Sequence, residues 1–215
     1  MNPNRFLILL LLLSLFPLLT ACGDGADAPG PLLFAESFTL GETADWQLER
    51  DALGQTSMRD GALHIELFGP NIMQFAALPD EPFADFVLQV EARQLRGDLG
   101  NSYGVLFRMQ NNQEFYRFEI TGNGMYMIER RNGDGTWTRY VETWTDHPAI
   151  NQGLNVTNVL RIEARGSEMA FYVNDVPVQE IQDTRYTSGT IALDAGTFVQ
   201  SDMEVAFDNL TIRQP

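Results

Sequence analysis

The chain has 215 residues and a formal net charge of −15, from 14 basic and 29 acidic residues. This acidity makes nucleic acid and anionic lipid headgroups poor partners, since proteins bind both through Lys and Arg. All the basic residues are arginine, which excludes Schiff-base chemistry on a lysine. Only His64 and His147 are present, which excludes a metal centre built from several histidines.

The N-terminal segment has the pattern of a secretory signal. Arg5 is followed by an apolar run, residues 6–19, which is shorter than the roughly 20 residues that span a bilayer. The run ends in Leu-Thr-Ala-Cys, residues 19–22, which resembles the bacterial lipobox. The resemblance implies that residues 1–21 are a lipoprotein signal peptide and that the sulfur of Cys22 receives a diacylglycerol.

Cys22 is the only cysteine, so a disulfide within one chain is excluded. The two or three acyl chains of a bacterial lipoprotein make a stable anchor, whereas one chain does not. Residues 22–31 are rich in Gly, Pro and Asp and indicate a solvated tether. We therefore expect one folded domain at residues 32–215, lipid-anchored and extracytoplasmic at the bacterial cell envelope, with the anchor as its only membrane contact.

Beyond the tether, short stretches of alternating apolar and polar residues follow one another between turn signals. In DFVLQVEARQL, every second residue from Phe86 to Ala92 is apolar, while Gln89 and Glu91 between them are polar. Asn-Gly-Asp-Gly at 132–135 is one of several turn signals. The spacing predicts an all-β fold, a two-sheet antiparallel sandwich whose strands each have one buried face.

Several blocks in order resemble concanavalin A-like lectin and glucanase domains, a group of jelly rolls that includes laminin G-like domains. The blocks are LLFAESF, DGALHI, NSYGVLFRMQNNQEFYRFEI, the segment from WTDHPAINQG to AFYVNDVPV, SGTIALDAG and VAFDNLTI. The resemblance covers nearly all of residues 32–213. It implies two sheets, one of which faces the glycan in members that bind sugars.

Catalytic glucanases of this group carry E-x-D-x-x-E on one strand, which places two glutamates on the same face. The chain has no such motif, and we assign no catalytic residue. Glu119, Glu129 and Glu163 alternate along strands but lie near arginines. We expect these arginines to lower the pKa of the glutamates and keep them ionised, either in surface ion pairs or on a polar binding face.

We consider two groups of residues for a ligand. Arg108, Arg117 and Glu119 lie on the two strands of an apparent hairpin, where they could bind sugar hydroxyls or an acidic glycan. Sugar recognition usually adds an aromatic platform. The sequence TWTRYVETWTDH supplies four candidates for it: Trp137, Tyr140, Trp144 and His147. The same aromatic residues could instead cover the end of the core, and Trp46 is assigned to packing.

The resemblance also suggests a structural calcium ion. Many of these jelly rolls hold Ca²⁺ with an acid near the start, a backbone carbonyl at an early Gly turn and an Asp on the last strand. The matching positions are Glu36, Gly61 and Asp208. Calcium prefers such oxygen ligands. The alternative is that Asp208 only accepts backbone hydrogen bonds at a strand end.

Together these features favour a lectin-like domain that binds carbohydrate, such as a cell-surface glycan, without cleaving it. One alternative is a sugar-active hydrolase of the glucanase-like or 3-keto-disaccharide type. The other is a protein-interaction or structural module of the laminin G-like kind.

The anchor gives a first prediction. Cys22→Ser removes the sulfur that would be acylated, so we expect the protein to move from the membrane fraction to the soluble extracytoplasmic fraction. Fractionation and immunoblotting of the expressing bacterium measure this, with the wild-type protein as control. A Cys22→Ser protein that remains with the membrane would contradict acylation.

Overall fold

A computed structural model describes residues 30–39, 44–79 and 82–215, so the signal peptide and Cys22 lie outside the described residues. The described chain consists of strands, turns and loops, and contains no α-helix. No helix in it is long and apolar enough to cross a membrane. The strands are β1 (Leu32–Glu36), β2 (Gly54–Arg59), β3 (Ala62–Leu67), β4 (Met73–Ala77), β5 (Phe86–Arg96), β6 (Ser102–Asn111), β7 (Glu114–Thr121), β8 (Met125–Arg131), β9 (Trp137–Arg139), β10 (Thr145–Asp146), β11 (Thr157–Arg165), β12 (Glu168–Val173), β13 (Val176–Gln182), β14 (Thr190–Gly196) and β15 (Met203–Arg213).

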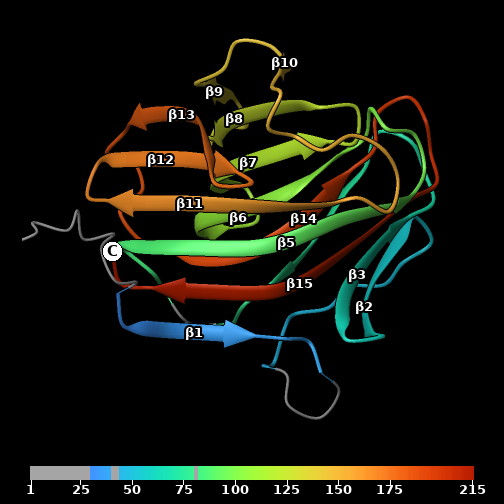
Figure 1. The fold of residues 1–215 in the computed structure, drawn as a ribbon, viewed down its shortest axis with the longest axis horizontal. Coiled ribbons are helices and arrows are strands. Elements are labelled where there is room, and N and C mark those ends of the chain that lie inside the picture. The colour runs from blue at the N-terminus through green and yellow to red at the C-terminus, as the bar shows by residue number, and fades with distance from the viewer. Residues whose placement is uncertain (1–29, 40–43, 80–81) are drawn as a thin grey trace, which may run out of the picture.

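The strands form two antiparallel sheets packed face to face (Figure 1). The eight-stranded sheet has the order β13-β12-β11-β5-β15-β3-β2, and β1 pairs with β15. The seven-stranded sheet has the order β10-β8-β7-β6-β14-β4, and β9 pairs with β8. This confirms the predicted all-β, two-sheet antiparallel sandwich.

Alternation along the strands explains why the two sheets stack. Phe86, Leu88 and Val90 of β5 are fully buried, whereas Gln89 between them is exposed, as the sequence predicts. Phe171 of the eight-stranded sheet has its ring 5.9 Å and 5.2 Å from two phenylalanine rings of the seven-stranded sheet, Phe107 and Phe118. Edge-to-face and tilted aromatic contacts of this kind join the two inner faces.

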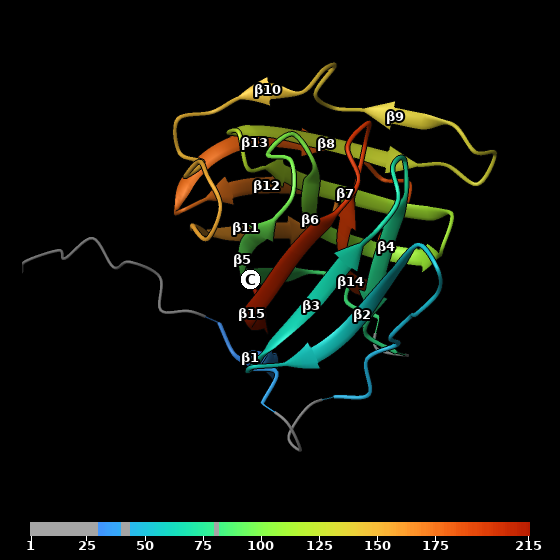
Figure 2. The ribbon, with the colours of Figure 1, turned by 90° about the vertical axis from the view of Figure 1, so that its right-hand side faces the viewer.

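Consecutive hairpins build the half of the seven-stranded sheet that carries the candidate site. β6, β7 and β8 pair in sequence order, and the turn at 132–135 returns the chain so that β9 pairs with β8. β10 pairs with the other end of β8, so β9 and β10 lie beyond it at the sheet edge (Figure 2). The loops next to β9 and β10 can therefore reach the outer face of this sheet, the face turned away from the eight-stranded sheet.

Phe171→Ala tests the contact between the sheets. Phe171 is fully buried, so the change leaves a cavity where three rings meet, and we expect a loss of about 3–5 kcal/mol in the free energy of unfolding. Urea denaturation measures it. The control is Val199→Ala, because Val199 is 81% exposed and should change stability by less than about 0.5 kcal/mol. Equal effects of the two substitutions would show that this contact does not hold the sheets together.

Candidate functional site

The packing of the core shows which side chains of β7 point outward. Phe107 and Phe118 face Phe171 inside the sandwich. Because side chains alternate along a strand, Arg117 and Glu119 lie on the outer face of the seven-stranded sheet.

Two carboxyl groups meet on this outer face across a glycine. Glu119 of β7 pairs in register with Gly104 of β6, and Gly104 pairs with Asp194 of β14. A Cβ atom on Gly104 would lie 2.0 Å from the carbonyl oxygen of Phe118, so the strand cannot take a side chain there without shifting. The glycine therefore allows the backbone of β7 to approach β6 closely between the two acids.

Both acids are completely buried, and burial raises both of their pKa values. For Glu119, Arg117 at 3.1 Å and the hydroxyl of Ser102, which donates at 2.8 Å, oppose this rise by favouring the ionised form. Burial and the charge of Glu119 raise the pKa of Asp194 well above its usual value. Neither carboxyl oxygen of Asp194 has a hydrogen-bond partner in the described chain. Glu119 and Asp194 are called the acid pair below.

This corrects the expectation that a neighbouring arginine lowers the pKa of Glu119. The arginine is present, but full burial outweighs it, because removing a carboxylate from water costs more than one ion pair returns. Glu163 forms ion pairs with Arg161 and with Arg165 at 4.0 Å, and its side chain is 20% exposed.

Arg117 connects the acid pair to the surface. Burial alone would lower the pKa of Arg117, but the surrounding acids raise it and hold the guanidinium charged. It pairs with Glu129 of β8 and lies 4.7 Å from the ring centre of Trp137. Arg131 lies 5.0 Å from the same ring, and Arg139 lies 3.6 Å from the Glu129 carboxylate. These five residues, three arginines with Glu129 and Trp137, form what we call the arginine cluster.

Two aromatic side chains meet across one end of the sheet. Trp144 precedes β10 and Phe198 follows β14, and their ring centres are 5.9 Å apart in a T-shaped contact. Since β7 and β6 lie between β8 and β14, the two side chains must reach across this end of the sheet to meet. Met127, which pairs with Glu119 in register, is only 4% exposed.

Arg108 lies elsewhere, although we expected it beside Arg117 and Glu119. A register shift follows Phe107, and Arg108 has a positive φ of 46°. Its guanidinium is fully buried and donates to the carbonyl oxygens of Ala84 at 2.9 Å and Tyr186 at 3.3 Å. The bulge therefore directs Arg108 into the interior, where it supports the backbone.

The four residues that we expected to form an aromatic platform are also separated from one another. Trp137 belongs to the arginine cluster and Trp144 contacts Phe198. Tyr140 donates its hydroxyl to Asp183, at the side where β13 ends. The ring of His147 lies 6.0 Å from that of Tyr126. Of these four, only Trp137 contacts one of the charged residues that we expected at the ligand site, Arg117. Ligand binding by all four stays a prediction.

The three expected calcium ligands do not form one donor set. The carboxylate of Glu36 accepts the N–H groups of Phe38 at 2.9 Å and Ala44 at 2.7 Å, so it is satisfied without a cation. Gly61 and Asp208 line a separate hollow of about 120 Å³. Among the described residues, no three His, Cys, Asp or Glu side chains cluster as metal ligands. These residues do not fit a shared calcium ion, and structural calcium stays a prediction.

The sequence reasoning missed Gly104, Ser102 and Asp194. A signal existed for Asp194, because it is the one acid within the otherwise apolar strand TIALDAG. Its partners could not be found from the sequence, because their pairing depends on the strand order. Trp46 was assigned to packing, and it is 7% exposed with its ring 5.4 Å from that of Phe38.

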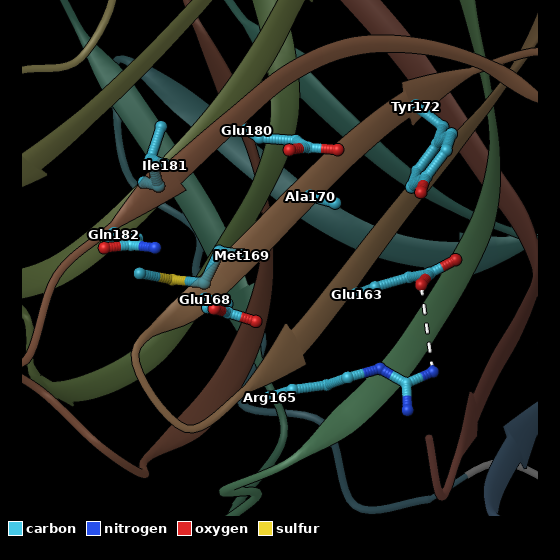
Figure 3. Close-up of a pocket in the computed structure, with 9 residues that line it drawn as sticks. All are labelled: Glu163, Arg165, Glu168, Met169, Ala170, Tyr172, Glu180, Ile181 and Gln182. Atoms are coloured by element: carbon cyan, nitrogen blue, oxygen red, sulfur yellow. Dashed lines mark ion pairs between the residues drawn. The ribbon is translucent and has the colours of Figure 1, made fainter.

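The outer face of the eight-stranded sheet has a larger hollow, of about 530 Å³, along β11, β12 and β13 (Figure 3). Glu163 and Arg165 of its lining form an ion pair at 4.0 Å, which Figure 3 marks with a dashed line. The ring of Tyr172 is covered by the guanidinium of Arg161 at 3.7 Å. This hollow lacks the buried charges that distinguish the opposite face, so we place the candidate site at the acid pair and the arginine cluster.

The raised pKa values of the acid pair predict how stability depends on pH. The folded state holds protons that the unfolded chain releases above its usual pKa values of 3.8 for Asp and 4.5 for Glu, so stability falls as pH rises above about 4. Asp194→Asn removes one of these groups. At pH 7 we expect this variant to be more stable than the wild type, because Asn needs no proton to be neutral, and we expect the gain to disappear near pH 4.

Thermal melts from pH 4 to pH 8 measure the effect. Asp175→Asn is the control, because the Asp175 side chain is 86% exposed, and we expect its profile to follow the wild type. An Asp194→Asn profile parallel to the wild type would mean that the acid pair does not take up a proton on folding.

Comparisons with known proteins support this architecture. A carbohydrate-binding module of family 66 from Bacillus subtilis superposes with a TM-score of 0.64 at 14% identity, covering 80% of this chain and 96% of the module. A Bacillus subtilis protein of unknown function with a galectin-like fold superposes with a TM-score of 0.66 at 12% sequence identity. The match covers 87% of this chain and 97% of that protein. A β-glucanase from Bacillus licheniformis superposes with a TM-score of 0.61 at 12% sequence identity. The match covers 86% of this chain and 99% of the glucanase.

At these identities the likeness shows the concanavalin A-like fold alone. No curated protein matches the chain at a significant level. A sequence profile described as the 3-keto-alpha-glucoside-1,2-lyase-like domain matches residues 36–213, most of the chain. The chain therefore belongs to the family of 3-keto-alpha-glucoside-1,2-lyase-like domains.

Proposed function

We propose that the protein binds an α-glucoside on the outer face of the seven-stranded sheet, through the arginine cluster. The observation that carries the proposal is the contact of Trp137 with two guanidinium groups, those of Arg117 at 4.7 Å and Arg131 at 5.0 Å from the ring centre. Glu129 pairs with Arg117 and lies 3.6 Å from Arg139. The cluster presents fixed hydrogen-bond donors and one carboxylate acceptor at the edge of an aromatic ring, which suits sugar hydroxyls.

The comparisons support the choice of ligand. The family is named for 3-keto-α-glucosides, and two proteins with the same fold are a carbohydrate-binding module and a β-glucanase. We further propose that the domain works at the bacterial cell envelope, held by the lipid on Cys22. A lectin-like role is the simplest function of such a site.

A second candidate function is elimination on a 3-keto-α-glucoside, and the acid pair favours it. The C3 carbonyl makes the proton on C2 acidic. The ionised member of the pair would take this proton while the C2–H electrons form a C1=C2 double bond and the bond from C1 to its glycosidic oxygen breaks. The protonated member would give its proton to the departing oxygen, and the raised pKa values of both acids suit this step.

The two candidates are separated by turnover. We expect methyl α-glucoside and its 3-keto derivative to bind the wild-type domain, as measured by calorimetry. Release of methanol from the 3-keto derivative, lost in Glu119→Gln while binding is retained, would establish the elimination. Binding without release would leave the lectin-like role.

Arg139→Ala tests the site itself. The Arg139 side chain is 57% exposed, so its loss should change the free energy of unfolding by less than about 0.5 kcal/mol. A hydrogen bond to a charged group contributes about 1.5–3 kcal/mol, so affinity for methyl α-glucoside should fall by about tenfold or more.

The matched control is Arg165→Ala, because Arg165 is 58% exposed on the opposite sheet and also approaches a glutamate. We expect this control to bind like the wild type. Equal affinity of Arg139→Ala and the wild type would exclude the arginine cluster as the binding site. Repeating the titration with a chelator tests whether calcium is required.

A further inference from the structure

The guanidinium of Arg117 has a different polar partner at each of its nitrogen atoms. Nε lies 3.1 Å from the carboxylate of Glu119, and Nη2 donates to the carboxylate of Glu129. Nη1 donates to the thioether sulfur of Met73 at 3.3 Å. A thioether is a neutral and weak acceptor, whereas a carboxylate is a charged one. Met73 is therefore the weakest of the three partners, and Nη1 is the donor that a ligand can take most easily.

The contact between Arg117 and Met73 crosses the outer face of the seven-stranded sheet. Arg117 lies on β7 and Met73 on β4, and the strands β6 and β14 lie between them. Neighbouring strands are about 4.8 Å apart, so the two backbones are separated by about 14 Å and two long side chains must cover that distance. Gly196 of β14 pairs in register with Met73 and has no side chain to obstruct it. The Met73 sulfur is thus held beside the arginine cluster.

Met73 is also accessible from solvent. The buried methionines of the described chain are Met109, Met127, Met169 and Met203. Three others, Met58, Met73 and Met125, are partly exposed. Of these three, only Met73 has its sulfur in contact with an arginine. An oxidant in solution can therefore reach a sulfur atom that contacts the candidate site.

We propose that Met73 is a modification site, at which oxidation of the thioether to the sulfoxide by a peroxide weakens ligand binding to the arginine cluster. A lone pair of the sulfur attacks one oxygen of hydrogen peroxide, so that the S–O bond forms and the O–O bond breaks. The departing hydroxide takes the proton of the transferred oxygen and leaves as water. The sulfur is oxidised and the peroxide is reduced.

The sulfoxide changes the partner that a ligand must displace from Arg117. Its oxygen is a polar acceptor, and the hydrogen bond that a charged guanidinium donates to it is stronger than the one to a thioether. Nε and Nη2 face carboxylates, so the ligand competes for Nη1. This effect rests on the proposed function and deepens it, because it is a regulation of the same site.

Peroxide treatment of a variant with a single reactive methionine tests the proposal. In the full chain, Met58→Leu with Met125→Leu leaves Met73 as the one partly exposed methionine of the described residues. Peptide mass spectrometry measures oxidation, and calorimetry measures binding of methyl α-glucoside before and after treatment. We expect Met73 to gain one oxygen and the affinity to fall by about tenfold.

The matched control adds Met73→Leu to the same variant. Leucine has no sulfur, so we expect its affinity after peroxide treatment to stay within twofold of its own untreated value. Met73→Gln places an amide oxygen near the position of the sulfoxide oxygen. We expect this substitution to lower the affinity without peroxide.

A second measurement does not depend on a sugar. NMR of the nitrogen-labelled protein follows the exchange of the Arg117 guanidinium protons with water, and Arg117→Lys identifies these signals by their loss. We expect slower exchange after oxidation, because the sulfoxide holds Nη1 more firmly.

The outcomes separate this inference from the function on which it rests. A Met73 that gains no oxygen would overturn the modification site. Unchanged proton exchange and unchanged affinity in the oxidised protein would overturn the regulation and leave the proposed function in place. No binding by the untreated protein would overturn the proposed function and the effect on binding together, whereas the NMR measurement would still decide whether oxidation tightens the contact between Met73 and Arg117.

Discussion

The contact of Phe171 with Phe107 and Phe118 is the constraint on which the site depends. It fixes which side of β6 and β7 faces the eight-stranded sheet. Because strand side chains alternate, the same contact turns Gly104 and Glu119 outward together. A slip of one residue in either strand would turn phenylalanine to water and the carboxyl group into the core, so the aromatic core also protects the register of the acid pair.

Burial of the acid pair destabilises the folded state, and this is an argument that the pair serves a function. Asp194 and Glu119 are fully buried, and one arginine cannot balance both of them together with Glu129. Replacing a buried charged group by apolar side chains often stabilises a protein. The charged groups on the other sheet, such as Arg161 and Glu163, are paired and stay partly exposed, so they destabilise the folded state less. Groups with perturbed pKa values tend to gather where a protein binds or reacts, and the contrast between the two outer faces follows that tendency.

Sequence periodicity predicted the sandwich because alternation reports directly on which face of a strand is buried. Phe86, Leu88 and Val90 show this. Periodicity could not predict Arg108, because one extra residue in a strand turns the side chain to the other face and leaves the composition of the segment unchanged. Nor could it predict the raised pKa of Glu119. The neighbouring arginine was visible in the sequence, whereas the depth of burial depends on loops and strands that come together only in the fold.

The position of β15 has a consequence for how the chain folds. This strand lies between β5 and β3 and also holds β1, although it comes after all of them in the sequence. Until it is in place, the eight-stranded sheet consists of separate pieces with unpaired edges. Pairings this distant along the chain fold slowly, because the loop must close before the contacts form. The domain should therefore fold late and as a unit, and its exposed edges before that point are where it is most open to aggregation or to a chaperone.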